Sequence, residues 1–178
     1  MRKDPKLIET QRFRLKEIQQ SDIANIYKGL SDPEVTKHYA VKFPTIEATQ
    51  EQMDWYANLR KKETGIWWGI YFKEGEEFCG AGGFNNLDKT HQKAEIGFWL
   101  LPQFWGRGIM EEVMPVLFKE GFESLHLNRI EGFVESDNHK CKRALTKLDF
   151  HYEGTMRECE IKNGEFIDLD IYAVLRKR

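Results

Sequence analysis

Stretches in which apolar and polar residues alternate with a period of two recur along this chain, and they predict β-strands. The last stretch shows the pattern best, because the odd-numbered positions from Ile167 to Leu175 are all apolar. The predicted strands cover residues 13–18, 66–72, 78–84, 94–101, 129–135, 150–160 and 167–175. Short connections join the three strands between positions 66 and 101, so we expect an antiparallel meander there.

Apolar residues spaced three and four positions apart predict helices between these strands. The helices cover residues 22–30, 45–62, 109–125 and 138–148, and Asp137 or Asn138 is the expected N-cap of the last one. Pro115 lies inside the third helix and should bend it, because proline removes one backbone hydrogen bond. The order β-α-α-β-β-β-α-β-α-β-β, without repeats or a linker, predicts one α/β domain over residues 1–178 around a mixed, mostly antiparallel sheet.

Composition narrows the class of protein. The 178 residues contain 27 Lys and Arg against 29 Asp and Glu, and this balance gives no electrostatic case for binding nucleic acid or an anionic membrane. The N-terminal residues lack the apolar core of a secretory signal, and no apolar run approaches the ~20 residues that span a bilayer. Cys79, Cys141 and Cys159 have neither an even number nor a C-x-x-C spacing. We therefore expect a cytoplasmic protein without a disulfide framework or a zinc site.

The junction between the fourth strand and the third helix carries the most informative motif. Pro102 stops ladder pairing after the strand of residues 94–101, because proline has no N–H to donate. Gly106 and Gly108 follow, and helical spacing begins at Ile109. Glycines at such a turn let the backbone approach a ligand closely, while the first N–H groups of the helix remain unpaired. This geometry binds anions, most often a phosphate.

The residues around these glycines separate the known classes of phosphate loop. A triphosphate-binding loop needs Gly-Lys-Ser/Thr, whereas Gly108 is followed by Ile109 and Met110. A dinucleotide-binding loop needs a third glycine at position 111, where this chain has Glu111, and a parallel βαβ unit. Neither class fits.

With Gln103 before the glycines, residues 103–108 resemble the Q/R-x-x-G-x-G/A signature of the GCN5-related N-acetyltransferases (GNAT). Residues 10–15 and 30–35 look like the opening of the RimJ/RimL branch of that family, which contains ribosomal-protein N-terminal acetyltransferases. Residues 94–108 and 129–150 resemble two further segments of the same branch. The resemblance implies the GNAT fold, a cytoplasmic transferase and acetyl-CoA as co-substrate.

By position, the resemblance also implies which residues bind coenzyme A. The pantetheine arm would pair, like an added strand, with the backbone of Phe98, Trp99, Leu100 and Leu101. The pyrophosphate would be held by Gln103, Phe104, Trp105, Gly106, Arg107, Gly108, Ile109 and Met110. Asn138 would hydrogen-bond the pantetheine, a role compatible with that of a helix N-cap.

Four positions depart from the family pattern. Glu111 replaces a small hydroxyl residue and puts a carboxylate near the predicted phosphate turn. Pro115 is a residue that the family does not usually have in the helix predicted at residues 109–125. Asp149 stands where the family has glycine, and Cys141 stands where it has serine. Glu111 and Pro115 bear on coenzyme A affinity, and Asp149 bears on the turn before the predicted strand of residues 150–160.

Forming an amide from a thioester needs a neutral amine, a proton acceptor and donors for the developing oxyanion, but no metal. Glu95 is the candidate base, because it faces the same side of its strand as Gly97 and Trp99. An exposed strand residue without a catalytic role is an equally good reading of Glu95. The alternatives are a relay water and the carboxylates of Asp88, Glu131 and Glu135.

The family's usual general acid, a tyrosine, corresponds to Leu145. Cys141 is then the candidate proton donor to the departing thiolate, since an unperturbed thiol has a pKa of about 8.5. A packed, inert cysteine is the competing interpretation.

The resemblance therefore predicts an acetyl-CoA-dependent N-acetyltransferase acting on a peptide N-terminus or a small amine, with a homodimer as a possible assembly. The alternative is a non-catalytic module of the same fold that binds acyl-CoA as a sensor or assembly partner.

Overall fold

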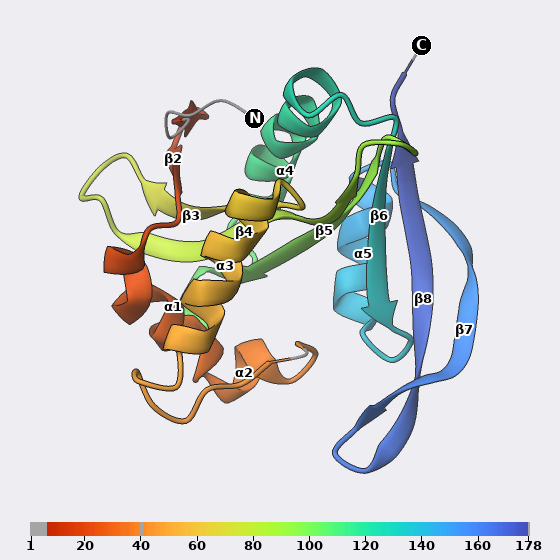
Figure 1. The fold of residues 1–178 in the computed structure, drawn as a ribbon, viewed down its shortest axis with the longest axis horizontal. Helices are drawn as coiled ribbons and strands as arrows, with labels where there is room; N and C mark the ends of the chain where they lie inside the picture. Colours follow the sequence, from red (N-terminus) through yellow and green to blue (C-terminus); the bar gives the residue numbers. More distant parts are fainter. Residues whose placement is uncertain (1–6, 40, 178) are drawn as a thin grey trace.

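The computed structural model describes residues 7–39 and 41–177 of the chain. Its strands form one sheet in the order β1-β2-β3-β4-β5-β6-β8-β7 (Figure 1). They are β1 (Ile8–Glu9), β2 (Phe13–Glu17), β3 (Ile66–Phe72), β4 (Phe78–Asp88), β5 (Lys93–Leu100), β6 (Arg129–Glu135), β7 (His151–Lys162) and β8 (Glu165–Leu175). All neighbouring strands pair antiparallel except β5 and β6, which are parallel. The predicted mixed, mostly antiparallel sheet is confirmed.

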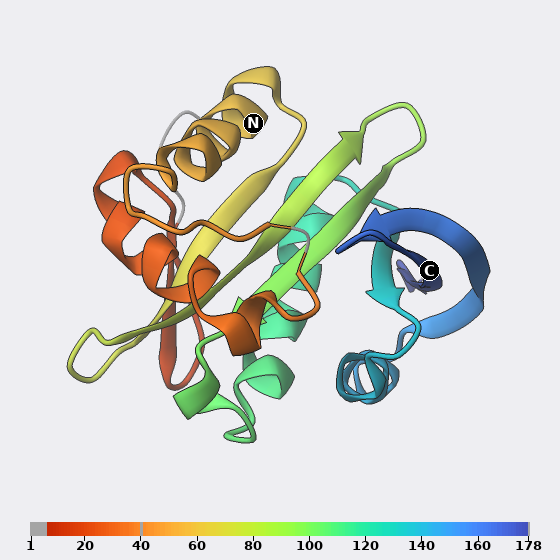
Figure 2. The same cartoon turned by 90° about the horizontal axis from the view of Figure 1, so that it is seen from below.

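Helices cover both faces of this sheet. They are α1 (Ile23–Leu30), α2 (Pro33–Thr36), α3 (Gln50–Lys62), α4 (Ile109–Lys119) and α5 (His139–Lys147). α1 and α3 lie on one face and α4 on the other (Figure 2). Side chains of β5 alternate between these layers: the Trp99 ring fills the space beside Gly29 of α1, whereas Phe98 packs at Gly82 together with Leu117 of α4. The side chain of Glu95, an even number of residues from Trp99, points to the α1 and α3 side.

The two central strands separate soon after they begin. The parallel pairing of β5 with β6 runs over Lys93↔Arg129, Ala94↔Ile130 and Glu95↔Glu131. Beyond Glu95, β5 continues to pair with β4 on its other edge, up to Leu100 with Gly80. Figure 1 shows β5 and β6 diverging from this point. The later half of β5 therefore has one edge without a ladder from β6.

Several element boundaries differ from those expected. Residues 45–49 form turns, in which the Thr49 N–H donates to Thr45 O at 3.2 Å, so α3 begins only at Gln50. β4 extends to Asp88, and α4 gives way to a π-helical turn over Glu120–Ser124. Asn138 rather than Asp137 is the N-cap of α5. None of the helices in the described part of the chain is long and apolar enough to cross a membrane.

Asp149 lies in the turn between α5 and β7 with φ of +63°. This left-handed conformation is the one that glycine adopts most readily, and aspartate tolerates it better than most residues. The structure thus shows how the turn accommodates a side chain at this departure from the family pattern.

Candidate active site

The loop between β5 and α4 has the backbone conformation of an anion site. Gly106 and Gly108 have φ of +73° and +70°, and Gly108 is the N-cap of α4. The first intrahelical bond joins the Glu112 N–H to Gly108 O at 3.2 Å, so the N–H groups of Ile109 and Met110 at the start of the helix have no intrahelical acceptor. Left-handed residues beside such a helix start make a concave array of N–H groups, on which a phosphate can bind.

The open edge of β5 leads into this loop. The Leu101 N–H donates to Cys79 O at 2.9 Å, which directs the backbone of Leu101, and by alternation that of Trp99, toward β4. The backbone groups of Phe98 and Leu100 therefore face the side where β6 has diverged. Leu100 O accepts a hydrogen bond of 2.8 Å from the indole Nε1–H of Trp105. Of the four backbones predicted to bind pantetheine, those of Phe98 and Leu100 thus lie on the open edge.

The side chains of the predicted loop residues differ in exposure. Phe104 and Ile109 are buried, and Met110 is half-buried against the core. Gln103, Trp105 and Arg107 are exposed. The Arg107 guanidinium lies 5.6 Å from the centroid of the Phe104 ring. These contacts anchor the loop through its side chains, and its backbone N–H groups remain the predicted binding element.

The start of α5 contacts the β5–α4 loop and α4. The Asn138 side chain accepts a hydrogen bond of 3.1 Å from the Cys141 N–H, which is the expected N-cap. The ammonium of Lys140 lies 5.7 Å from the centroid of the Trp105 ring. The Glu111 carboxylate pairs with Lys147 at 3.2 Å, so it is directed toward α5. Two contacts therefore connect α5 with the loop and with α4.

The Cys141 thiol is half-buried beside the core. Burial raises its pKa to about 11. A thiol whose pKa lies above the ordinary value of about 8.5 donates its proton unfavourably to the thiolate of coenzyme A. This environment favours packing over the predicted acid role. Leu145, at the position of the family's tyrosine, is buried in the core.

Glu95 lies where the β5–β6 pairing ends, on the side of the sheet opposite to α4. Its Oε2 accepts a hydrogen bond of 2.9 Å from the Asn86 side chain. The Trp67 ring covers Gly97, two residues further along the strand. The pKa of the Tyr39 hydroxyl is raised well above its usual value, first by burial and then by the nearby Tyr56 and Glu95. Glu95 thus has a neutral hydrogen-bond partner and an aromatic neighbourhood.

The other carboxylates proposed from the sequence are engaged differently. Asp88 accepts the His91 N–H at 2.9 Å, which lowers the pKa of that carboxyl. Glu131 accepts hydrogen bonds from Arg129 at 2.7 Å and from Lys93 at 3.2 Å. Cations thus already neutralise the charge of Glu131, whereas no cation is described beside the Glu95 carboxylate.

Glu135 belongs to a cluster that joins the segment after α2 to the ends of β6 and β7. Its Oε2 lies 2.7 Å from His38 Nδ1, and its Oε1 accepts a hydrogen bond from Lys162. Lys162 Nζ also donates to Lys37 O at 2.5 Å. With Asp137, His38 and Glu135 form a group whose possible ligand atoms lie within 4.8 Å of one another. Lys162 supplies the positive charge at this group, so we interpret it as an ion-pair tie between three elements.

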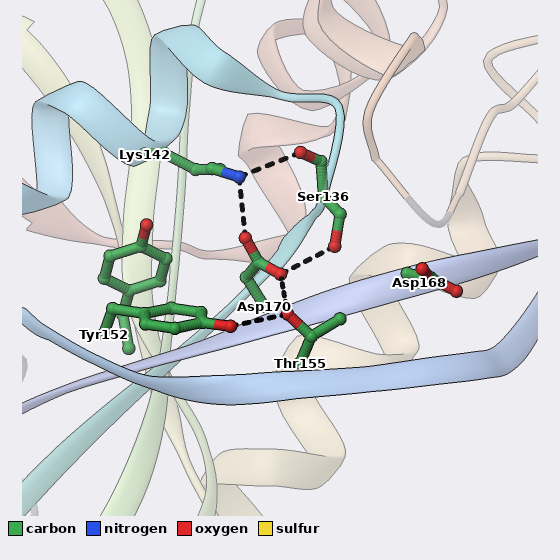
Figure 3. A pocket seen from close by; sticks show the side chains of 7 residues that line it. Ser136, Lys142, Tyr152, Thr155, Asp168 and Asp170 are labelled. Atoms are coloured by element: carbon green, nitrogen blue, oxygen red, sulfur yellow. Dashed lines mark hydrogen bonds and ion pairs between the residues drawn. The ribbon is translucent and has the colours of Figure 1, made fainter.

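A separate polar pocket lies between α5 and the β7–β8 hairpin (Figure 3). It has a volume of about 590 Å³ and is lined by Ser136, Lys142, Tyr152, Thr155, Asp168, Asp170 and Tyr172. The Asp170 carboxylate is 4% exposed and accepts hydrogen bonds of 2.7 Å from Lys142, Ser136 and Thr155.

Burial alone would raise the pKa of Asp170, but these donors outweigh burial and lower it. Lys142, Ser136 and Thr155 satisfy the Asp170 carboxylate, and none of the residues predicted to be catalytic or to bind the cofactor lines the pocket. We therefore assign this network to the anchoring of α5 on the hairpin.

Sequence reasoning missed His38 and Lys162 at the tie, because only the folded chain brings residues about 125 positions apart together. It also missed the contacts of Arg12 and Glu112 behind the β5–α4 loop. Arg12 does lie in the segment 10–15 that resembles the family, but that resemblance predicts no contact or function for Arg12.

Comparison with known proteins agrees with this geometry. Residues 12–151 match the sequence model of the acetyltransferase (GNAT) domain. Over 173 residues the chain is 33% identical to the uncharacterized N-acetyltransferase YoaA of Bacillus subtilis (strain 168), covering 97% of this chain and 98% of YoaA. It is 29% identical over 104 residues to the ribosomal-protein-serine acetyltransferase of Escherichia coli (strain K12), covering 58% of each chain.

A solved structure shares the fold. The structure of RimL, the ribosomal L7/L12 alpha-N-protein acetyltransferase, in complex with coenzyme A superposes with a TM-score of 0.86 at 20% identity, covering 96% of this chain and 98% of RimL. The match to the family over most of the chain carries the assignment. This chain belongs to the GNAT acetyltransferase family and is an N-acetyltransferase.

Proposed function

We propose that this protein transfers the acetyl group of acetyl-CoA to the α-amine of a peptide or protein N-terminus. The observation that carries the proposal is the continuous path from the open edge of β5 to the left-handed glycines at the start of α4. Phe98 and Leu100 offer backbone groups to a pantetheine arm, and the N–H groups of Gly108, Ile109 and Met110 suit its pyrophosphate. The Leu100 carbonyl already accepts the Trp105 indole N–H, so the arm would pair there with the Leu100 N–H or displace the indole.

The position of Glu95 supports direct transfer with general-base assistance. The pantetheine arm would reach the end of the β5–β6 pairing from the α4 side, while Glu95 faces the opposite side of the sheet. An amine arriving there attacks the thioester carbonyl; the C–N bond forms, the C–S bond breaks and coenzyme A leaves as a thiolate. The proton of the amine passes to the Glu95 carboxylate, directly or through water.

The charges around Glu95 support an acceptor with one positive charge. Glu131 is paired with Arg129 and Lys93, and Glu135 with His38 and Lys162. A polyamine carries several cations and would gain most from several unneutralised carboxylates. A peptide N-terminus carries one ammonium, for which Glu95 suffices. The similarity to a ribosomal-protein acetyltransferase supports the same acceptor class.

The test is an acceptor panel at saturating acetyl-CoA. Its arms are a peptide with a free N-terminus, the same peptide with a blocked N-terminus and a free lysine, and spermidine. Release of the coenzyme A thiol is followed continuously, and the product is identified by a mass gain of one acetyl group. We expect turnover with the free N-terminus to exceed that with both other acceptors. Preference for spermidine would overturn the acceptor class, and no thiol release above background with any amine would overturn the function.

A further inference from the structure

Arg12, just before β2, makes an unusual set of contacts behind the glycine loop. Its Nη1 and Nη2 atoms each lie 3.2 Å from Arg107 O, and Nη2 lies 3.4 Å from Gly108 O. Its Nε donates to the Glu112 carboxylate at 2.6 Å, and its backbone N–H donates to the same carboxylate at 2.7 Å. The Thr10 hydroxyl adds a third donor to Glu112 at 2.6 Å. Residues about 100 positions apart are thus joined at the start of α4.

These contacts fix the direction of two peptide groups of the loop. In a trans peptide the C=O and the following N–H point in opposite directions within one plane. Since the carbonyls of Arg107 and Gly108 point toward the Arg12 guanidinium, the N–H groups of Gly108 and Ile109 point away from it. Both belong to the array of N–H groups at the start of α4. Arg12 therefore presents them on the side where an anion would lie.

The geometry distinguishes this arrangement from direct binding of phosphate by Arg12. A guanidinium has five N–H donors, and here the Nη atoms contact loop carbonyls while Nε contacts Glu112. Burial alone would raise the pKa of Glu112, but hydrogen bonds from Thr10 and Arg12 outweigh burial and lower it. Glu112 therefore remains charged at neutral pH and keeps the guanidinium turned toward the carbonyls.

Arg12 contacts two loop carbonyls as well as a carboxylate, so it makes more contacts than an ordinary surface ion pair, which contributes little to stability. Arg14, on the same strand, provides the comparison, because its guanidinium pairs with Glu9 at 3.1 Å and with Glu76 at 2.5 Å. Those partners lie on β1 and in the β3–β4 turn. Arg14 has the chemistry of Arg12 without a described contact to the glycine loop.

We propose that Arg12, held in place by Glu112 and Thr10, is a positioning residue that orients the Gly108 and Ile109 amides toward the pyrophosphate of acetyl-CoA. This inference rests on the proposed function of the loop as the coenzyme A site. It extends that function, because affinity for the donor would depend on a residue that does not itself touch the donor.

The experiment compares Arg12→Met with the parent and with Arg14→Met, using two acetyl donors. Acetyl-CoA carries the pyrophosphate, whereas S-acetylpantetheine has the thioester and the pantetheine arm but no phosphate. Arg12→Met should raise the KM for acetyl-CoA roughly tenfold, the worth of about one charge-assisted hydrogen bond. The turnover number at saturation and the KM for S-acetylpantetheine should not change. Arg14→Met should leave all of these values at those of the parent.

An equal rise in KM for both donors, or none for either, would overturn the inference. Should Arg12→Met fail to fold, Thr10→Val removes one hydroxyl donor to Glu112 and should give a smaller rise confined to acetyl-CoA. If the parent binds coenzyme A but acetylates no amine, the proposed function fails, and the calorimetric Kd of coenzyme A in the same variants then decides on Arg12. If the parent does not bind coenzyme A, both proposals fail.

Discussion

Two regions lie where β5 and β6 separate: the later half of β5 with the glycine loop, and the side chains around Glu95. They are built in different ways. The proposed donor end, residues 98–110, offers backbone N–H and C=O groups, and the directions of those in the glycine loop follow from two glycines and from Arg12. The proposed acceptor end instead offers side chains from separate segments of the chain: His38, Tyr39, Asn86, Glu95, Glu135 and Lys162. A site made of backbone depends on conformation, whereas a site made of side chains depends on which residues the fold brings together. Substitutions at the two ends should therefore change different kinetic constants.

The largest effect is expected at the acceptor end. Glu95→Gln keeps the size of the side chain and can still accept the hydrogen bond from Asn86, but it cannot take a proton from an amine. The turnover number should fall roughly 10²- to 10⁴-fold, the usual worth of general-base catalysis. The KM for acetyl-CoA should stay close to that of the parent, and part of the loss should be recovered at high pH, where more amine is neutral.

Glu131→Gln is the matched control, because Glu131 is the register partner of Glu95 but is already paired with cations. Its turnover number should remain within about threefold of the parent, as expected for a residue outside the reaction. Parental turnover in Glu95→Gln with an unchanged pH profile would remove Glu95 from the mechanism. A buried water or Glu135 would then be the next candidate.

The second effect belongs to the donor end. Gly108 has φ of +70°, and a β-branched side chain in this conformation costs about 1–3 kcal/mol of backbone strain. A Cβ at Gly108 would meet only Arg12 Nη2, at 3.7 Å, so the strain comes from the backbone rather than from a clash. Gly108→Val should weaken coenzyme A binding roughly 10- to 100-fold, since relieving the strain reorients the loop amides. Calorimetric titration measures the change.

Gly75→Val separates strain from binding. Gly75 lies in the β3–β4 turn with φ of +76°, and a Cβ there would have no neighbour within 4 Å. This variant should lose about as much thermal stability as Gly108→Val while keeping the parental coenzyme A affinity. Equal affinities for coenzyme A in the two variants would contradict the assignment of the loop.

The third effect tests the tie at the acceptor end. Lys162→Met removes the hydrogen bond to Lys37 O and the pairing with Glu135. The segment that carries Tyr39 then loses an anchor, so the KM for the peptide acceptor should rise roughly threefold to tenfold. The KM for acetyl-CoA should not change. Lys89→Met, which removes an exposed pairing with Glu63, is the control and should leave both constants alone. A rise confined to the KM for acetyl-CoA would show that the two ends are not separable.

The sequence predicted the backbone conformation of the β5–α4 loop far better than the contacts around Glu95 and Glu135. Gly106 and Gly108 are local signals, because a strand, two glycines and a helix start within one short segment specify backbone conformation directly. Likewise, alternation and helical spacing placed most elements of the sheet and its covering helices. The order β6-β8-β7 and the short pairing of β5 with β6 depend on long-range packing.

The acceptor end could not be assembled in the same way. His38 and Lys162 carry no local pattern, and their roles follow only from contacts across the fold. The hydrogen bond of Asn86 to Glu95 likewise depends on a long-range feature, the extension of β4 to Asp88. Arg12 shows the same limit at the donor end, since its partners lie about 95 and 100 residues away.

The smallest effect concerns Cys141 on α5. Burial raises its pKa to about 11, so the thiol stays protonated at neutral pH and donates its proton unfavourably. Cys141→Ala should therefore lower the turnover number by less than about twofold, and Cys141→Ser should behave alike. A tenfold loss in alanine that serine restores would instead establish Cys141 as the acid.

A pH titration of stability gives a second measure of the same thiol. Because the folded-state pKa lies above the unfolded value of about 8.5, the folded state binds the proton more tightly. The stability that this provides is fully present below pH 8.5 and is lost as the pH rises toward 11. Serine does not titrate in this range, so the free energy of unfolding of the parent should fall relative to Cys141→Ser between these two values. A constant difference between the two proteins would mean that the thiol is solvated, and a solvated thiol beside the coenzyme would again be a candidate acid.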